Sequence, residues 1–189
     1  MGQLFELIAD HALEKLDDYY DECHVCDQTA VDLYRYQGKL HLENGEIDDD
    51  IYAVCTDCLL TKKLTHSCDF DYIRTITNYL ATSSLSIEEQ ESMRQILIEK
   101  YQKTPDVPLF MQYVDRPLCC NDITMFTGHP TDKAELYRMT ENVIYWEKQI
   151  KEKSGGYNFR ESGNPESFRE VASFQCRHCG RNYFTFQFT

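Results

Sequence analysis

The stretch Cys23-His24-Val25-Cys26, followed after 28 residues by Cys55-Thr56-Asp57-Cys58, decides how we interpret the rest of the chain. Each C-x-x-C turn can bring two sulfur atoms to one ion, so two such turns supply the four ligands of a tetrahedral Zn²⁺ site. Two redox dithiols, or four buried cysteines without a metal, would give the same pattern. We predict a zinc site with four ligands, which are Cys23, Cys26, Cys55 and Cys58.

The residues between these two pairs predict a β-hairpin. Residues 31–36 alternate apolar and polar side chains, Gln37-Gly38 interrupts the alternation, and a second extended run covers residues 39–42. Asn44-Gly45 is a turn signal, and residues 51–54 predict a strand that leads to the second cysteine pair. We therefore expect a zinc-knuckle subregion, a hairpin held by the C-x-x-C turns, over residues 23–60.

The composition limits which classes of protein this chain can belong to. The chain has 189 residues, of which 42% are hydrophobic and 13% aromatic, so it can bury a core, and we expect a single domain over residues 1–189. It has no run of about 20 apolar residues and no signal-peptide pattern at its start, so we expect no membrane insertion and a cytoplasmic location. In that reducing compartment the nine cysteines favour metal binding over disulfides.

The net charge limits which kinds of partner this chain can bind. The formal net charge is −13, and each closed Cys₄ zinc site adds about two more negative charges. Such a surface repels phosphates, which argues against a nucleic-acid partner, and it favours a basic protein. Alternatively, the acidity only keeps the protein in solution. The acidic candidates for partner contact are Asp17, Asp18, Asp21, Glu22, Asp48, Asp49 and Asp50.

Apolar periodicity and end signals predict four helices. Ser86 and Glu89 form a capping box, Thr131 can cap the longest helix, and Gly155-Gly156 can end it. Residues 109–114 are a strand candidate. The expected fold is therefore α+β, with zinc-knuckle β-hairpins packed against several helices. The predicted helices cover residues 4–16, 69–80, 86–103 and 132–153.

A third C-x-x-C pair, Cys176 and Cys179, lies between strands predicted at residues 171–175 and 182–189. It needs further ligands to hold zinc, and Cys119-Cys120 are the obvious source. Adjacent cysteines reach one ion only if the backbone turns sharply, so one of them could be replaced. The candidates for that replacement are Asp122, His129 and His178.

Two readings of this third pair stay open. It can form a second site with Cys119, Cys120 or both, in a subregion made of residues 110–130 and 170–189, which gives two Zn²⁺ ions. Alternatively, it joins the first cysteine set, Cys119 and Cys120 are core residues, and one ion is bound. Cys68 stands apart from every pair, and we expect it to be a small buried apolar residue.

The chain resembles the CbrC family, which is named for a bacterial protein associated with colicin tolerance. Three features carry the resemblance: the early C-x-x-C region, residues 120–128 with Cys120-Asn121-Asp122, and the terminal C-x-x-C hairpin at residues 174–180. It covers residues 23–60 and 110–189, whereas residues 69–103 match less well and the family's proline-rich opening is absent. The family tends to have a His-Cys pair at Cys119-Cys120, and this exchange keeps a metal ligand.

Several functions remain open at this point. The first is a zinc-binding, non-enzymatic interaction protein, an immunity or tolerance factor that neutralises a basic toxin through its acidic surface. The second is a zinc-dependent hydrolase that uses Cys120, Asp122 and His129, although no H-E-x-x-H and no deaminase signature occurs. A nucleic-acid-binding zinc ribbon is opposed by the charge, and a thioredoxin-like dithiol lacks a βαβ context. We favour the first function.

Overall fold

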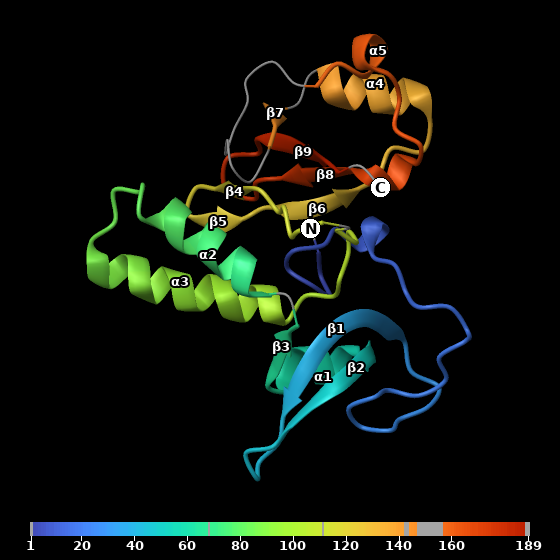
Figure 1. Ribbon diagram of the computed structural model, residues 1–189, viewed down its shortest axis with the longest axis vertical. Helices are drawn as coiled ribbons and strands as arrows, with labels where there is room; N and C mark the ends of the chain where they lie inside the picture. The colour runs from blue at the N-terminus through green and yellow to red at the C-terminus, as the bar shows by residue number, and fades with distance from the viewer. Residues whose placement is uncertain (1, 68, 111, 142–143, 147–156, 188–189) are drawn as a thin grey trace.

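The computed structural model describes residues 2–67, 69–110, 112–141, 144–146 and 157–187. These residues form five α-helices and three small sheets, which confirms the predicted α+β class. A three-stranded sheet lies in the lower part of the molecule in Figure 1, a four-stranded sheet lies in the upper part, and two helices lie to one side. Cys68 is outside the described residues.

The lower sheet is built around the predicted hairpin. β1 (Leu33–His41) pairs antiparallel with β2 (Ile47–Cys55) on one side and with β3 (Leu64–His66) on the other. The chain turns at Asn44-Gly45, where Gly45 has a φ of 88° that a glycine adopts without strain. The first half of β2 is exposed and its second half is buried, so β2 carries the chain from solvent into the core.

The predicted interruption at Gln37-Gly38 is wrong, because β1 continues through it. The pairing with β2 shifts register on both sides of Gly38, which is the pattern of a β-bulge. A Cβ atom at Gly38 would lie 2.1 Å from the Tyr36 ring and 2.7 Å from the Thr65 carbonyl oxygen. Glycine at this position therefore lets β1 and β3 approach each other, rather than ending the strand.

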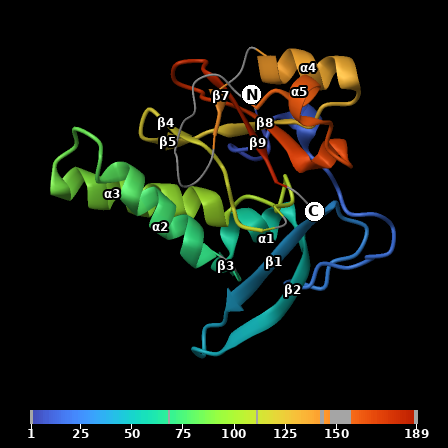
Figure 2. The same cartoon turned by 45° about the horizontal axis from the view of Figure 1, so that its top comes forward.

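α2 (Asp69–Leu80) and α3 (Ile87–Gln102) lie side by side (Figures 1 and 2). The capping box at the start of α3 is confirmed. The Ser86 hydroxyl accepts a hydrogen bond from the Glu89 N–H, and the Glu89 carboxylate accepts one from the Ser86 N–H. The buried side chains of the two helices include Tyr72, Ile76, Leu80, Leu97 and Tyr101.

The upper sheet has the strand order β6-β8-β9-β7. β8 (Val171–Gln175) and β9 (Asn182–Phe186) form the predicted terminal hairpin, β6 (Met125–Gly128) pairs with β8, and β7 (Ile144–Tyr145) runs parallel to β9. A separate two-stranded ladder joins short segments just before β6. Its strands are β4 (Leu118–Cys119) and β5 (Asp122–Ile123).

The helix predicted over residues 132–153 is wrong as a continuous element. α4 spans only Lys133–Glu141, and β7 follows at Ile144–Tyr145. The backbone N–H of Trp146 donates to the Phe184 carbonyl oxygen at 2.9 Å, and Trp146 is 3% exposed. Pairing with β9 therefore outweighs the helical periodicity, because aromatic side chains pack well on a sheet. Residues 147–156 lie outside the described residues.

Smaller elements cover the outer face of the upper sheet in Figure 1. α5 (Phe159–Ser162) lies beside α4, and a 3₁₀ turn, η2 (Phe168–Glu170), precedes β8. A satellite cluster of buried side chains joins these helices to the sheet. Its members are Leu136, Phe159, Val171, Phe184 and Phe186.

The helix predicted over residues 4–16 is also wrong, since only a 3₁₀ turn, η1 (Asp10–Ala12), forms there. The backbone of Leu7 and Ala9 instead bonds to Phe126 of β6, at 2.9 Å in both directions. Phe5, Leu7, Ile8 and Ala12 are buried while Leu4 is exposed, so the segment buries most of its hydrophobic residues without a helix. The strand predicted at residues 109–114 does not form over the described part, 109–110 and 112–114.

One cluster of buried side chains runs from the lower sheet through α2 and α3 to the upper sheet. At the junction, the His66 ring stacks on the Tyr36 ring with centroids 4.1 Å apart. The centroid of the Tyr101 ring lies 4.5 Å from that of the His66 ring. The ring nitrogens of His66 lie 3.0 Å from the Asp106 carboxylate and 3.1 Å from the Thr104 carbonyl oxygen.

Among the helices of the described residues, none combines the length and the apolar composition that a span of a lipid bilayer requires.

Candidate metal centres

The N-terminal centre consists of Cys23, Cys26, Cys55 and Cys58, whose four sulfur atoms all lie within 4.8 Å of one another. Three of these cysteines are buried and Cys26 is partly exposed. Cys23 and Cys26 belong to a turn that is closed by the hydrogen bond from the Asp27 N–H to the Cys23 carbonyl oxygen, at 2.9 Å.

Cys55 and Cys58 come from the junction of β2 with α1 (Thr56–Thr61). Cys55 is the last residue of β2 and the N-cap of α1, and Cys58 lies in the first turn of that helix. Residues three apart in a helical turn share one face, so the two sulfur atoms point to the same side. The Cys55 N–H also lies 3.3 Å from the Cys23 sulfur, which joins the two halves of the centre.

The C-terminal centre consists of Cys119, Cys120, Cys176 and Cys179, again with all four sulfur atoms within 4.8 Å. Cys119 and Cys176 are buried, whereas Cys120 and Cys179 are exposed. The hairpins β4–β5 and β8–β9 each supply two of these cysteines. Of the two readings that the sequence left open, the structure therefore shows the one with a second, separate cluster.

A tight turn lets two adjacent cysteines enter one cluster. Cys120 and Asn121 are the two residues between the paired strands β4 and β5, and their φ values are 53° and 58°. Two consecutive positive φ angles are the signature of a type I′ hairpin turn. The left-handed conformation costs a non-glycine residue about 1–2 kcal/mol, so this turn holds Cys120 in a strained backbone.

Both clusters have the dimensions of a tetrahedral Cys₄ zinc site. Zinc–sulfur bonds of about 2.3 Å in a tetrahedron place the sulfur atoms about 3.8 Å apart. The sulfur–sulfur separations are 3.9 Å for Cys26–Cys55, 3.8 Å for Cys119–Cys120 and 3.6 Å for Cys119–Cys179. A disulfide needs about 2.05 Å, and all eight of these cysteines are free. Four thiolates are the donor set of structural zinc, so the residues fit that ion.

The thiols differ in how readily they ionise. Burial and the neighbouring thiols raise the pKa of Cys58 and of Cys119 well above the ordinary value. By contrast, hydrogen bonds to the exposed Cys179, the largest from the Arg181 N–H, lower its pKa to about 7. A dication has to displace the protons of the raised thiols, so metal binding weakens as the pH falls.

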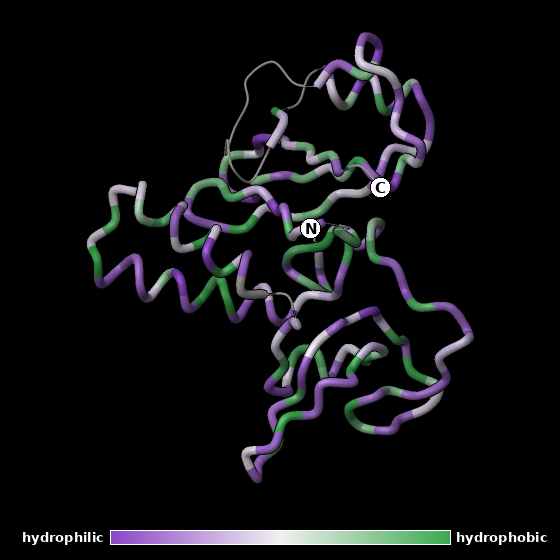
Figure 3. Tube along the Cα trace, in the orientation of Figure 1, coloured by the Kyte–Doolittle hydropathy of each residue, from purple (hydrophilic) through white to green (hydrophobic). Residues whose placement is uncertain are grey.

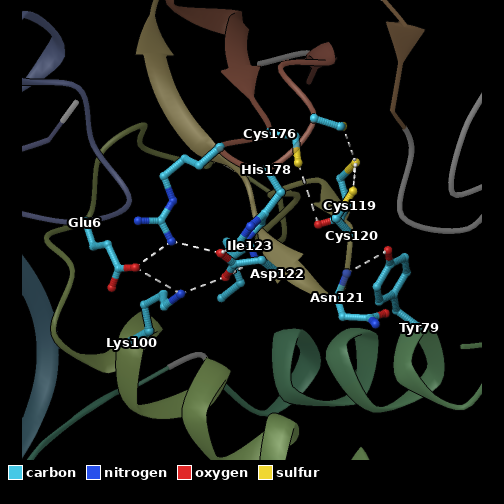
Figure 4. Close-up of polar contacts among 12 residues, drawn as sticks. Glu6, Tyr79, Lys100, Cys119, Cys120, Asn121, Asp122, Ile123, Cys176 and His178 are labelled. Atoms are coloured by element: carbon cyan, nitrogen blue, oxygen red, sulfur yellow. Dashed lines mark hydrogen bonds and ion pairs between the residues drawn. The ribbon is translucent and has the colours of Figure 1, made fainter. Parts of the chain in front are cut away.

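An ionic network around the buried Asp122 carboxylate lies against the C-terminal centre (Figure 4). The side chain of Asp122, which is 8% exposed, accepts from Lys100 at 2.7 Å, from Arg177 at 2.8 Å and from His178 at 2.8 Å. Glu6 joins the same cations, at 3.2 Å from Lys100 and 2.5 Å from Arg177. Burial raises the pKa of the Asp122 carboxyl, but hydrogen bonds from Lys100, His178 and Arg177, together with the charge of Lys100, outweigh burial and hold the pKa below its ordinary value.

This network ties together four parts of the chain. Asp122 belongs to β5, Lys100 to α3, Arg177 and His178 to the C-x-x-C turn of the terminal hairpin, and Glu6 to the N-terminal segment. It fixes the turn between Cys176 and Cys179 through contacts that need no metal. Its cations also lie near a Cys₄ set that would carry two negative charges when a zinc ion is bound.

The other predicted ligands of this centre lie elsewhere. Asp122 and His178 are paired with each other and are not members of the four-sulfur cluster. His129 hydrogen-bonds the Val171 carbonyl oxygen at 2.8 Å, and Val171 is at the opposite end of β8 from Cys176. Five residues of strand span about 16 Å, so His129 cannot join the cluster. It lines a separate cavity of about 150 Å³ beside Arg169.

The seven acidic residues proposed for partner contact are all exposed. In β2, Asp48 and Asp50 precede Tyr52, and a shift of register against β1 between Asp48 and Ile51 interrupts the alternation before the face of Tyr52. The Tyr20 ring lies 5.1 Å from the Tyr52 ring, which places the preceding loop against this face. Figure 3 shows hydrophilic stretches along this hairpin and the loop. The remaining acidic candidates, Asp17, Asp18, Asp21 and Glu22, belong to that loop.

The sequence interpretation missed the network around Asp122. Nothing in the sequence around Lys100 and Glu6 indicates that they belong to this network, because charged residues of this kind are usually solvated. Asp122 and Arg177 did carry one, since each lies within two residues of a predicted ligand. Once the four cysteines meet, these two side chains must be close neighbours.

Comparison of the chain with models of protein families, with curated proteins and with solved structures gives no match.

Proposed function

We propose that this chain is a zinc-binding interaction protein without catalytic chemistry, whose acidic N-terminal half binds a basic protein. One observation carries the proposal: exposed carboxylates concentrate around the N-terminal centre. Thirteen of the 32 acidic residues but only five of the 19 basic residues lie between Leu13 and His66. That segment therefore holds more than half of the net negative charge in less than a third of the chain.

The contact surface that we propose is the acidic-tyrosine patch, which consists of Tyr19, Tyr20, Asp48, Asp50 and Tyr52. Tyr19 is 83% exposed, and the Tyr20 and Tyr52 rings pack together beside the aspartates of β2. Tyrosine is enriched among the residues that dominate binding energy at protein interfaces. Carboxylates around it would steer a basic partner and set the orientation of the complex.

Two closed Cys₄ clusters support a structural rather than a catalytic role for the metal. A catalytic zinc keeps a coordination position open for water or substrate, whereas four thiolates fill a tetrahedral shell. In the N-terminal centre, zinc would join the loop of residues 23–26 to the end of β2. The metal would then hold the two parts of the acidic-tyrosine patch together.

We propose further that the partner is a basic toxin and that the chain is a bacterial immunity or tolerance factor. A nuclease toxin needs a basic groove for phosphates, and an acidic protein that covers the groove would block it. The resemblance to the CbrC family supports this reading and is itself part of the proposal. The alternative of a zinc-dependent hydrolase is weakened, because His129 lies about 16 Å along β8 from the cluster that contains Cys120.

The test measures toxin tolerance and direct binding. Bacterial cells with and without the chain are challenged with a panel of basic nuclease toxins, and survival is scored. We expect the chain to protect against at least one toxin, and we expect the purified pair to bind less tightly as the salt concentration rises. The double variant Asp48→Lys/Asp50→Lys should abolish both effects.

The matched control makes the same charge change elsewhere. Glu161→Lys/Glu166→Lys alters two exposed carboxylates near α5, far along the chain from the patch, and should keep protection and binding. Equal loss of binding in the two double variants would show that binding depends on net charge alone and not on this patch. Unchanged survival against the whole panel would contradict the toxin proposal while leaving the zinc centres untouched.

A further inference from the structure

The two cysteine centres differ in the solvent exposure of their sulfur-bearing side chains. In the N-terminal centre, Cys23 is 0% exposed, Cys55 4% and Cys58 3%, so only Cys26 is partly accessible. In the C-terminal centre, two of the four cysteines are exposed. Thiolate oxidation depends on access as well as on ionisation, so the two centres should not react alike.

We propose that the C-terminal centre is a peroxide-sensitive site, in which Cys179 is oxidised and forms a disulfide with Cys119, with release of the metal. Cys179 is exposed, and its sulfur lies 3.6 Å from that of Cys119. Cys120 is exposed too and lies 3.8 Å from Cys119. A disulfide between those adjacent residues would close a strained eight-membered ring, so Cys179 is the favoured partner.

The chemistry requires only hydrogen peroxide as the oxidant. The Cys179 thiolate attacks one peroxide oxygen, an S–O bond forms, the O–O bond breaks and hydroxide leaves. The Cys119 thiolate then attacks the oxidised sulfur, an S–S bond forms and a second hydroxide leaves. The two sulfur atoms lose two electrons, the peroxide gains them, and two protons from solvent complete two waters. Only Cys120 and Cys176 then remain as thiolate ligands, and two thiolates do not retain zinc against solvent.

The surroundings of this centre allow the reaction to stay local. Asp122 holds Arg177 and His178 at 2.8 Å each, inside the turn between Cys176 and Cys179. The main chain of the same turn is closed by the Gly180 N–H, which donates to the Cys176 carbonyl oxygen at 2.9 Å. These contacts survive metal loss, so the terminal hairpin keeps its place and reduction can restore the ligand set.

The experiment uses the full chain and needs no partner, so it is independent of the toxin proposal, although it rests on zinc binding. Zinc is first counted by elemental analysis, and two ions per chain are expected. Fewer than two would contradict the metal assignment and this proposal with it. Hydrogen peroxide is then added, and released zinc is followed with a coloured chelator.

We expect one zinc ion to leave at least about tenfold faster than the other. Peptide mapping after alkylation should find a Cys119–Cys179 disulfide and an alkylated Cys120. Dithiothreitol with added zinc should then restore two ions per chain. Release of both ions at one rate, or first oxidation in the N-terminal centre, would overturn the proposal.

Histidine variants separate oxidation from simple loss of a ligand. Cys179→His keeps a nitrogen ligand for zinc but removes the attacking thiolate, so the fast release should disappear while two zinc ions are still bound. Cys26→His makes the same exchange at the partly exposed cysteine of the N-terminal centre and should keep the fast release. If Cys179→His releases zinc as fast as the wild type, Cys179 is not the peroxide-sensitive residue.

Discussion

At the scale of single residues, Asp122 is the side chain whose substitution should lower the free energy of unfolding most. It is buried, and it neutralises cations from α3 and from the terminal knuckle. Removal of the Asp122 carboxylate leaves Lys100 and Arg177 largely buried, with the half-exposed Glu6 as the carboxylate that both still contact, and this loss costs more than the set contributes as a whole. Asp122 is therefore a structural residue, although its place beside two cysteines resembles that of a ligand.

We predict that Asp122→Asn lowers the free energy of unfolding by about 3 kcal/mol with two zinc ions still bound. The control is Asp71→Asn, which breaks an exposed ion pair with Arg74 and should cost below about 0.5 kcal/mol. Urea unfolding of the zinc-loaded proteins measures both. Similar costs for the two variants would show that the Asp122 network does not act as a buried set.

Asp106 gives a prediction for pH. Burial raises its pKa, but His66, the Gln37 N–H and Arg35 outweigh burial and hold the pKa below the ordinary value. A lowered pKa means that the carboxylate contributes stability above pH 4, and that this contribution is lost as the pH falls through the folded-state pKa.

We predict that Asp106→Asn costs about 2 kcal/mol at pH 7 and that its difference from the wild type shrinks below pH 4. The comparison is between two proteins with the same zinc centres, so the acid release of metal affects both. Unfolding free energies measured from pH 7 to pH 3 test this. A difference that grows toward low pH would contradict the assigned sign.

At the scale of elements, the lower sheet depends on glycine at one position for space and at another for conformation. Gly38 has no room for a Cβ atom between Tyr36 and Thr65. Gly45 has nothing within 4 Å of such an atom, but its φ is 88°. The same substitution therefore probes two different causes within one hairpin.

We predict that Gly38→Ala destabilises the protein by more than about 2 kcal/mol, because β1 and β3 must separate. Gly45→Ala should cost about 1 kcal/mol, which is the strain of a left-handed residue alone. Thermal unfolding ranks the two variants, and hydrogen exchange in β3 should rise only for Gly38→Ala. The reverse order would show that backbone conformation limits this sheet.

At the scale of the whole molecule, the two cysteine clusters join segments near opposite ends of the chain. The N-terminal centre closes the lower sheet, and the C-terminal centre joins the β4–β5 ladder to the terminal hairpin. Structural zinc contributes on the order of 10 kcal/mol to the folding of small metal-binding peptides. Loss of either ion should therefore weaken the whole molecule.

We predict that Cys55→Ser binds one zinc ion instead of two and unfolds at a lower temperature. Cys68→Ser, which changes the one cysteine outside both clusters, should keep two ions and the wild-type unfolding temperature. Elemental analysis at matched purity and thermal unfolding measure both quantities. A wild-type protein that binds no zinc when prepared without chelators would contradict the prediction, and so would equal zinc loss in the two variants.

Features that depend on short spacing could be predicted from the sequence. The C-x-x-C pairs predicted which cysteines gather, because two sulfurs three residues apart face one ion whatever surrounds them. The Ser86 capping box and the turn at Asn44-Gly45 are likewise local, and the structure contains both. These features were enough to predict the α+β class and the N-terminal cysteine cluster, whereas the second cluster was one of two readings that the sequence left open.

Features that depend on partners far along the chain could not be predicted, because they follow from tertiary contacts. Residues 4–16 and 144–145 have apolar patterns that fit a helix, but pairing with β6 and β9 satisfies their backbone as extended chain. The distance of His129 from the C-terminal centre follows from the length of β8. The ion pairs around Asp122 belong to a network that joins residues as far apart in sequence as Glu6 and Arg177, and no local pattern encodes them. Long-range pairing decides wherever two local conformations have similar free energies.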